Sequence, residues 1–129
     1  MEKMRTVVVV DDDSLMREML KVILQSENFQ VIGEAANGEM AIERCLKLKP
    51  DLVLLDINMP KMDGLQALQE IHKSSPTTKV MMVSAGATMD RVGEAILKGA
   101  SGFVVKPLNA ASVLDRIENC FKGEQRNDG

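Results

Sequence analysis

The sequence predicts an α/β domain of the doubly wound type, in which five helices cover a parallel sheet of five strands. Short apolar runs rich in β-branched residues alternate five times with segments of helical periodicity, and this alternation is typical of βα units. No long linker and no internal repeat interrupts the series, so the units form one domain. With 129 residues, 45% of them hydrophobic, the chain can bury the core that such a domain needs.

The first βα unit and the second strand follow from a simple pattern of apolar residues. Residues 6–10 form a continuous apolar run, which predicts a buried strand. Apolar side chains then recur at helical spacing over residues 15–26, and either Asp13 or Ser14 is placed to cap this helix. Residues 30–36 are expected to form the second strand.

The middle of the chain continues the alternation. Asn37 and the glycine after it open a helix that reaches residue 48, where Lys49-Pro50-Asp51 stops it. Residues 52–55 form the third strand. A loop rich in turn residues leads into a helix over residues 65–72, and residues 79–83 form the fourth strand.

The last elements are a helix at 88–98, a short strand at 103–105 and a final helix over 113–121. We expect the domain to cover residues 1–122 and residues 123–129 to form a polar tail. For the sheet we expect the flavodoxin-like strand order 2-1-3-4-5, because it is a common arrangement of five βα units. This order places the first and third strands side by side.

Composition excludes several classes of function. The net charge of −3 (16 basic and 19 acidic residues), with Lys and Arg scattered along the chain, argues against direct binding of nucleic acid. The apolar runs are shorter than the roughly 18 residues of a membrane span, and the first residues lack the apolar core of a signal peptide. We therefore expect a cytoplasmic protein with no membrane contact. Cys45 and Cys120 are expected to be reduced and partly buried.

Charged residues follow three of the expected strands at the point where each strand ends. Asp11, Asp12 and Asp13 follow the first strand, Asp56 follows the third, and Lys106 follows the fifth. The carboxyl ends of parallel strands meet at one edge of a sheet, where ligands of such folds bind. Carboxylates that lie close together repel one another unless a cation neutralises them. Mg²⁺ prefers carboxylate, carbonyl and water oxygens, so the pattern predicts a Mg²⁺ site.

Simpler explanations apply to the same residues. Acidic residues at a helix start often only cap the helix and interact with its dipole, and we expect this role for Asp13. A single acid after a strand is usually a solvated loop residue. Asp56, however, begins a loop that would hold it at the rim of the sheet, where a carboxylate can attack phosphorus and form an aspartyl phosphate. Lys106 would supply a second positive charge, although an exposed lysine is the commoner case.

Four motifs together resemble the receiver domain of bacterial two-component response regulators, in particular its stand-alone CheY-like members. The resemblance spans about residues 4 to 122, and it is specific because all four motifs occur in order. They are Val10-Asp11-Asp12, residues 56–64 (DINMPKMDG), Val83-Ser84-Ala85 and residues 102–107 (GFVVKP). It implies the CheY-like form of the flavodoxin-like fold and no enzymatic activity beyond the domain's own phosphorylation and dephosphorylation.

The resemblance also implies a role for each matching residue. Asp56 would accept the phosphoryl group, Asp12 would bind Mg²⁺ directly, and Asp11 would hold a metal-bound water. Asn58 would contribute its backbone carbonyl to the metal. Ser84 and Lys106 would each contact a phosphoryl oxygen, and Phe103 would be the aromatic residue that turns inward when Ser84 moves.

A partner-binding surface is expected around the fourth helix, fifth strand and fifth helix. Its candidates are apolar residues near the expected switch and one arginine: Met89, Val92, Phe103, Val105, Leu108 and Arg116. Ordinary helix packing explains the spacing of Met89 and Val92 equally well. The partners implied by the resemblance are a histidine kinase or phosphotransfer protein and a downstream target such as a flagellar motor component.

Three functions remain open at this point. The first is a phosphorylation-operated binding switch, in chemotaxis or in another pathway. The second is a Mg²⁺-dependent phosphatase of the haloacid dehalogenase type, which we disfavour because Asn58 stands where that class needs a second acid. The third is the receiver part of a longer DNA-binding response regulator, or an intermediate of a phosphorelay.

Overall fold

The expected five βα units are all present in the structure, a computed structural model that describes residues 4–60, 62–86 and 88–126, with the backbone alone for 123–126. The strands are β1 (Arg5–Val10), β2 (Phe29–Ala35), β3 (Leu52–Asp56), β4 (Lys79–Ser84) and β5 (Gly102–Val105). The helices are α1 (Ser14–Gln25), α2 (Gly38–Leu48), α3 (Gly64–Ser74), α4 (Met89–Leu97) and α5 (Ala110–Arg126).

The strands form one parallel sheet in the order β2-β1-β3-β4-β5, which confirms the predicted topology. In the register of the sheet, Val10 lies opposite both Ala35 and Leu55. Asp56 lies opposite Val83, and Ser84 lies opposite Val105. The charged residues that follow the strands therefore gather at one edge of the sheet.

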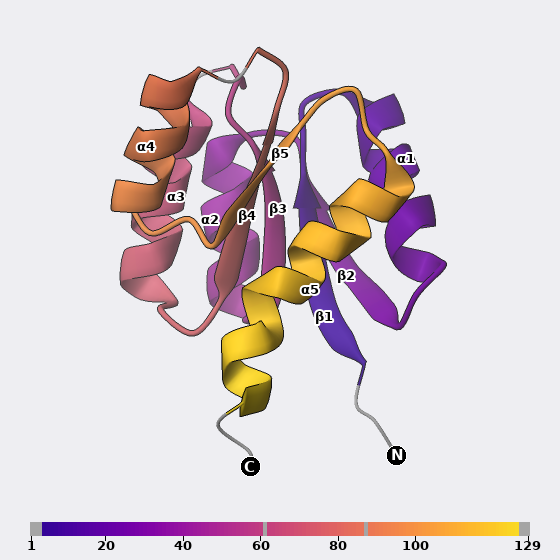
Figure 1. Cartoon of the computed structure of the whole chain (residues 1–129). Coiled ribbons are helices and arrows are strands. Elements are labelled where there is room, and N and C mark those ends of the chain that lie inside the picture. The colour runs from indigo at the N-terminus through magenta and orange to yellow at the C-terminus, as the bar shows by residue number, and fades with distance from the viewer. Residues whose placement is uncertain (1–3, 61, 87, 127–129) are drawn as a thin grey trace.

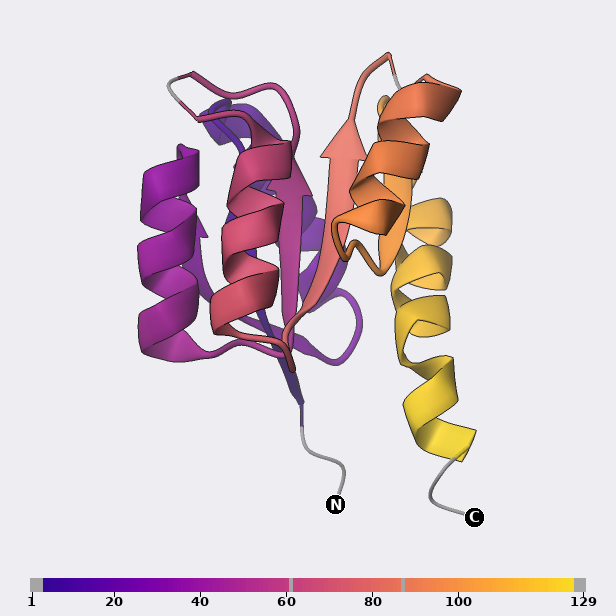
Figure 2. The same ribbon diagram turned by 90° about the vertical axis from the view of Figure 1, so that its left-hand side faces the viewer.

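Alternate residues of the buried strands face two separate cores, because successive side chains of a strand point to opposite faces. One core packs the sheet against α2, α3 and α4, and it contains Val8, Val53 and Leu55. The other packs the sheet against α1 and α5, and it contains Val7, Val9 and Leu54. Figures 1 and 2 show these two helical layers on the two sides of the sheet.

Side-chain caps set the starts of the helices. Asp13 caps α1 by accepting a hydrogen bond from the backbone N–H of Leu15 at 3.0 Å. Asn37, Asp63 and Thr88 cap α2, α3 and α4 in the same way. The alternative that Ser14 caps the first helix is thus wrong, and the expected capping role of Asp13 is confirmed.

Helix α5 is longer than the apolar spacing predicted. Its start is set by Asn109, whose side chain accepts from the N–H of Ser112 at 3.0 Å, and polar caps of this kind leave no trace in apolar periodicity. At the other end, Phe121 is buried and the Arg5 guanidinium lies 3.8 Å from the centroid of its ring, which fixes the late turns against β1. The helix continues to Arg126, so the first part of the expected polar tail is helical, while residues 127–129 lie outside the described residues.

The apolar spacing that predicts helix α1 lies mostly on its solvent side. Leu15, Met19 and Val22 are exposed and Ile23 is partly buried against the core, whereas Leu20 and Leu24 are fully buried. The helix itself is where the spacing placed it, because both faces repeat with the same helical period. Among the described residues, no helix combines the length and the apolar character needed to cross a membrane. Both cysteines are free thiols, and burial raises the pKa of Cys45 to about 12.

Candidate functional site

Three carboxylates meet at the carboxyl edge of β1 and β3. Asp11 and Asp12 follow β1, Asp56 ends β3, and the two strands are neighbours in the sheet. One carboxylate oxygen from each of the three lies within 4.8 Å of the others. Asp11 and Asp56 are buried, whereas Asp12 is exposed. The cluster therefore opens to solvent on the side of Asp12.

Lys106 brings a positive charge to this cluster from β5. Its Nζ atom lies 3.0 Å from Oδ2 of Asp11 and 3.7 Å from Oδ1 of Asp56. Because β4 lies between β3 and β5, the lysine side chain reaches past the end of β4. The backbone N–H of Lys106 donates to the carbonyl of Ser84 at 2.8 Å and so anchors the loop, and the Lys106-Pro107 peptide bond is cis.

The Asp56 carboxyl has a strongly raised pKa. Burial raises its pKa to about 6, and the charge of Asp11 acts in the same direction. The charge of Lys106 and a 3.3 Å hydrogen bond from the Asn58 backbone N–H lower the pKa, but they do not compensate. An ionised Asp56 thus lacks full neutralisation from the side chains around it.

The donor set fits a hard divalent cation. Among the described residues, three carboxylates face one lysine ammonium, so this cluster keeps an excess of negative charge. Both carboxylate oxygens of Asp11 are already engaged, one by Lys106 and one by the backbone N–H of Asp13 at 2.9 Å. This arrangement leaves Asp12 and Asp56 as the acids most available for direct coordination, consistent with an outer role for Asp11.

Gly64 is essential to the geometry around Asp56. A Cβ atom on Gly64 would lie 2.2 Å from the backbone oxygen of Asp56, and the Gly64 N–H donates to the carbonyl of Ile57 at 2.7 Å. The start of α3 therefore rests directly on the end of β3. The sequence pattern marked Gly64 only as a turn residue, and this close backbone approach is its structural reason.

Ser84 and Asn58 lie at the edge of the site without bridging to the Asp56 carboxylate through their side chains. Ser84 is buried, and its hydroxyl donates to the carbonyl of the adjacent Ala85 at 3.0 Å. Asn58 is exposed and contributes its backbone N–H to Asp56. Phe103 is 9% exposed, so it already occupies an inward position in this conformation.

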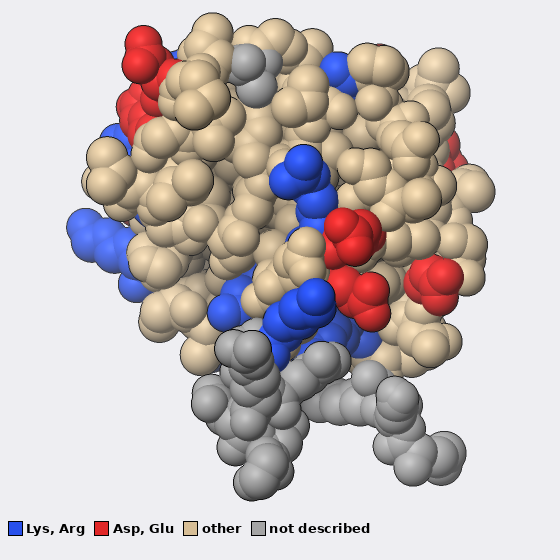
Figure 3. Space-filling view, in the orientation of Figure 1, with Lys and Arg blue, Asp and Glu red and all other residues tan. Residues whose placement is uncertain are grey.

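The expected partner surface is only partly exposed. Met89, Val105 and Arg116 are exposed, whereas Val92 and Leu108 are half-buried against the two cores. Sequence reasoning missed Ile96 and Leu97, which are exposed on α4; Ile96 follows Met89 by seven residues, or two helical turns, and this spacing could have identified it. Figure 3 views the side of the molecule with α4 and α5 in front, where uncharged side chains cover most of the surface.

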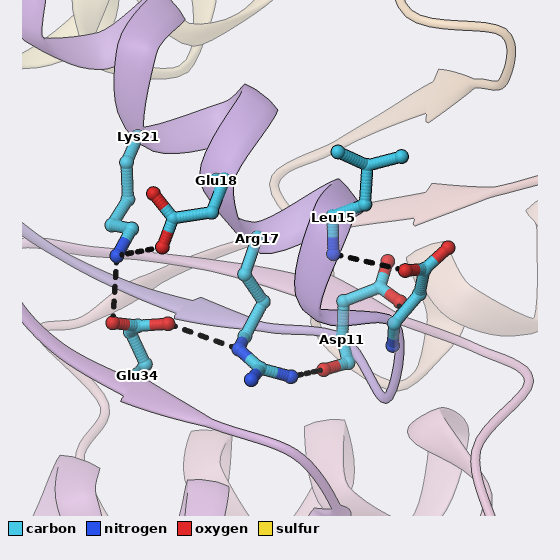
Figure 4. A network of polar contacts seen from close by, with 7 residues as sticks. Asp11, Leu15, Arg17, Glu18, Lys21 and Glu34 are labelled. Carbon is cyan, nitrogen blue, oxygen red and sulfur yellow. Dashed lines mark hydrogen bonds and ion pairs between the residues drawn. The ribbon is translucent and has the colours of Figure 1, made fainter.

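Sequence reasoning also missed Arg17. This residue lies on α1 and is not acidic, so neither strand ends nor motifs drew attention to it. Its guanidinium donates to the backbone carbonyl of Asp11 at 2.7 Å (Figure 4). A backbone acceptor cannot be read from residue type, and only the fold makes this contact visible.

Fold and site together define a class of protein, and comparison with known families gives the same one. The model of the response regulator receiver domain matches residues 7–118, and the chain belongs to this family. Proteins of this family are signalling switches rather than conventional enzymes, and acidic pockets that bind Mg²⁺ are typical of them.

Within this family, the chain is similar to CheY proteins. The chain is 44% identical over 119 residues to the chemotaxis protein CheY of Listeria monocytogenes, covering 92% of this chain and 100% of that protein. It is 42% identical to CheY of Thermotoga maritima, covering 92% and 98%. Among solved structures, the CheX-CheY-BeF3-Mg+2 complex from Borrelia burgdorferi matches with a TM-score of 0.88 and 39% identity, over 91% of this chain and 89% of that one. The chain is thus a receiver domain closely related to CheY.

Proposed function

We propose that this protein is a response regulator whose Asp56 accepts a phosphoryl group in a Mg²⁺-dependent reaction, and that the modification changes its affinity for a partner protein. The observation that carries the proposal is the buried Asp56 carboxylate, which lies beside two further acids and 3.7 Å from Lys106. A carboxylate in such a place can act as a nucleophile on phosphorus once a cation neutralises the phosphoryl oxygens.

Asp12, Asp56 and the backbone carbonyl of Asn58 would hold the metal, with Asp11 contacting it through water. Bound there, Mg²⁺ would neutralise the phosphoryl oxygens and so reduce the repulsion between two anions. A carboxylate oxygen of Asp56 would attack phosphorus, while the P–N bond of a phosphohistidine breaks and the imidazole leaves with the bonding electrons. The donor would be a histidine kinase or a phosphotransfer protein.

Lys106 and Ser84 would form new contacts with the phosphoryl group on Asp56. A phosphoryl group adds close to two negative charges and three acceptor oxygens to Asp56. Lys106 would move from Asp11 toward one of those oxygens, and Ser84 would exchange its weak contact with the Ala85 carbonyl for another. Because these contacts exist only in the modified state, they would shift the population between two conformers. Phe103 is already inward here, so phosphorylation would stabilise this position rather than create it.

The output surface would be formed by α4, β5 and α5. Exposed apolar residues support this assignment, since clusters of such residues mark interaction sites. They are Met89, Ile96, Leu97 and Val105. The exposed Arg116 of α5 and the half-buried Val92 and Leu108 would complete the surface. The names of the CheY relatives support chemotaxis as the pathway. The target would then be a flagellar motor component, and the protein would act in the cytoplasm.

The comparisons favour a single-domain regulator over the receiver part of a longer DNA-binding protein, because the CheY relatives are matched over nearly their whole length. The matched residues 7–118 fall inside the domain that we propose for residues 1–122. The phosphatase alternative stays disfavoured, since Asn58 and not an acid stands two positions after Asp56.

Intact mass spectrometry after incubation with acetyl phosphate tests the proposal. We expect one phosphoryl adduct on the wild type with Mg²⁺, and none with EDTA or on the Asp56→Asn variant. The Asp13→Asn variant is the matched control, because the Asp13 side chain caps α1 and asparagine caps equally well, while the backbone contact with Asp11 is kept; the adduct should stay intact. An adduct of equal yield on Asp56→Asn would place the acceptor elsewhere and refute the proposal.

A further inference from the structure

The Arg17 side chain joins two elements that flank the acidic cluster. Its Nη1 donates to the backbone carbonyl of Asp11 at 2.7 Å, and its Nε donates to Oε1 of Glu34 on β2 at 2.9 Å. The side chain is 19% exposed, so the guanidinium is largely shielded from water. Figure 4 shows it extended from α1 between Glu34 and the Asp11 backbone.

We propose that Arg17 is a positioning residue for Mg²⁺ binding: it fixes the peptide between Asp11 and Asp12 and thereby the directions of both carboxylates. This inference rests on the proposed function, because it assigns Arg17 a role in the Mg²⁺ site described above. Arg17 acts through the backbone and is not itself a ligand.

The Asp11 carbonyl lies just beyond the end of β1 and accepts a hydrogen bond from a side chain instead of from a neighbouring strand. Strand β1 ends at Val10, and the Asp11 N–H still donates to the carbonyl of Ala35 at 3.1 Å. The carbonyl of the same residue belongs to the peptide that leads to Asp12, and its partner is the Arg17 guanidinium. Rotation of this peptide would change the position from which the Asp12 side chain leaves the backbone. A charge-assisted hydrogen bond at this point resists that rotation.

Glu34 holds the guanidinium in place. Its second carboxylate oxygen accepts from Nζ of Lys21 at 2.8 Å, and the same Nζ lies 2.7 Å from Glu18. The hydrogen bond from Lys21, followed by that from Arg17, lowers the pKa of Glu34, so this carboxylate stays ionised at neutral pH. Glu34 also lies opposite Val9 in the β1–β2 register, close to the end of β1. The anchor therefore belongs to the rigid sheet.

An arginine suits this geometry better than a lysine does. Two separate nitrogens of one planar group donate to two acceptors on different elements. A lysine ammonium carries its N–H groups on a single atom and cannot span the acceptors in the same way. Replacement by lysine therefore separates the effect of positive charge from the effect of position.

Isothermal titration of metal-free protein with MgCl₂ tests the inference, using the wild type, Arg17→Met, Arg17→Lys and Lys21→Met. We expect both Arg17 variants to bind Mg²⁺ about tenfold more weakly, the lower end of the range for residues that orient metal ligands. Lys21→Met should bind nearly as the wild type does. It is the matched control, because Lys21 lies on the same helix and shares Glu34, and among the described residues its ammonium pairs with Glu18 and Glu34 and not with the Asp11 backbone.

A second readout does not depend on the metal. In metal-free protein the amide nitrogen chemical shift of Asp12 should move in Arg17→Lys and stay unchanged in Lys21→Met, because this nitrogen shares a peptide with the Asp11 carbonyl. This measurement uses the lysine variant, which keeps the charge, so it does not depend on the fold tolerating methionine.

The outcomes separate the two proposals. Wild-type affinity for Mg²⁺ in a folded Arg17→Lys protein, with an unmoved Asp12 shift, would overturn the inference and leave the proposed function standing. Failure of the wild type itself to bind Mg²⁺ would overturn the proposed function, and the role of Arg17 with it.

Discussion

Asp56 carries its carboxylate at a position where burial and a neighbouring acid oppose its ionisation. The pKa of this group is raised from 3.8 to about 6, and burial is the largest cause. Folding of the metal-free protein must therefore either protonate Asp56 or hold its charge in a poor environment. Cation binding removes this conflict, so the same carboxylate that favours metal binding lowers the stability of the free protein.

The first prediction concerns the stability of the metal-free protein. Since the pKa of Asp56 is higher in the folded state, the folded state binds the proton more tightly, and the destabilising effect is fully present above pH 6. We expect Asp56→Asn to stabilise the protein by about 2 kcal/mol at pH 7.5 in EDTA. The gain should shrink between pH 6 and pH 4, as the wild-type carboxyl becomes protonated. Urea denaturation at several pH values measures it.

Asp13→Asn is the control for this prediction. It also removes one acidic group near the site, but Asp13 is exposed and asparagine caps helices equally well. A gain from Asp56→Asn that stays constant between pH 7.5 and pH 4 would contradict the assignment to a raised pKa.

Single residues also mark the limit of prediction from sequence. Asp12, Asp56 and Lys106 could be found because each follows an apolar run, and parallel strands bring such positions together. Arg17 could not, because its acceptors are a backbone carbonyl and a glutamate from a different strand. Contacts of that kind depend on side-chain directions that residue spacing does not encode.

At the scale of elements, the junction between β3 and α3 leaves room for a hydrogen atom but not for a side chain. Gly64 has helical backbone and no unusual torsion, so its requirement is purely spatial. Asp56 ends β3 and Asn58 lies in the loop before Gly64, and a shift of α3 would displace both. The packing of this one residue thus connects the helix to the geometry of the acidic cluster.

The second prediction compares two Gly→Ala substitutions at helical positions. Gly64→Ala should destabilise the protein by about 1 to 3 kcal/mol, because its Cβ would contact backbone atoms of Asp56 and Ile57. It should also slow phosphorylation by acetyl phosphate. Gly93 lies on α4, and apart from its chain neighbours and the backbone of its own helix no described atom would lie within 4 Å of the new Cβ, so Gly93→Ala should stabilise by about 0.5 to 1 kcal/mol.

Urea denaturation and adduct formation are to be measured on both glycine variants. Equal effects of the two substitutions would mean that helix propensity, and not the contact with β3, determines the response. Gly93 lies on α4 and is not one of the site residues, so its variant also tests whether a more stable α4 by itself changes the phosphorylation rate.

At the scale of the whole molecule, stability comes from two cores that share one sheet. Each strand contributes side chains to both cores. In the two central strands β1 and β3, every residue from Val7 to Val10 and from Leu52 to Leu55 is at most 1% exposed. Loss of volume in either core should therefore weaken the sheet that positions the carboxylates.

The third prediction compares two Leu→Ala substitutions. Leu54→Ala should cost about 2 to 5 kcal/mol, because Leu54 is fully buried and the substitution leaves a cavity. Leu15→Ala, on the exposed face of α1, should change stability by less than about 0.5 kcal/mol. Thermal or urea denaturation distinguishes the two, and a large cost at Leu15 would show that this face is covered in solution.

The fold was predictable as a whole because its signals are redundant. Five apolar runs and five helical segments define the sheet even where a boundary moves, as it does at β2 and α5. The orientation of a helix is less redundant: the spacing of Leu15, Met19 and Val22 located α1 but described its solvent face. Exposure depends on which side meets the sheet, and that depends on the complete arrangement of strands.

The contact between Lys106 and Asp11 joins residues that lie 95 positions apart. During synthesis the three acids leave the ribosome well before Lys106, so a chain that stops before residue 106 contains the acidic cluster without the lysine that pairs with Asp11. Under the proposed function, such a chain could not form the Lys106 contact that responds to phosphorylation of Asp56.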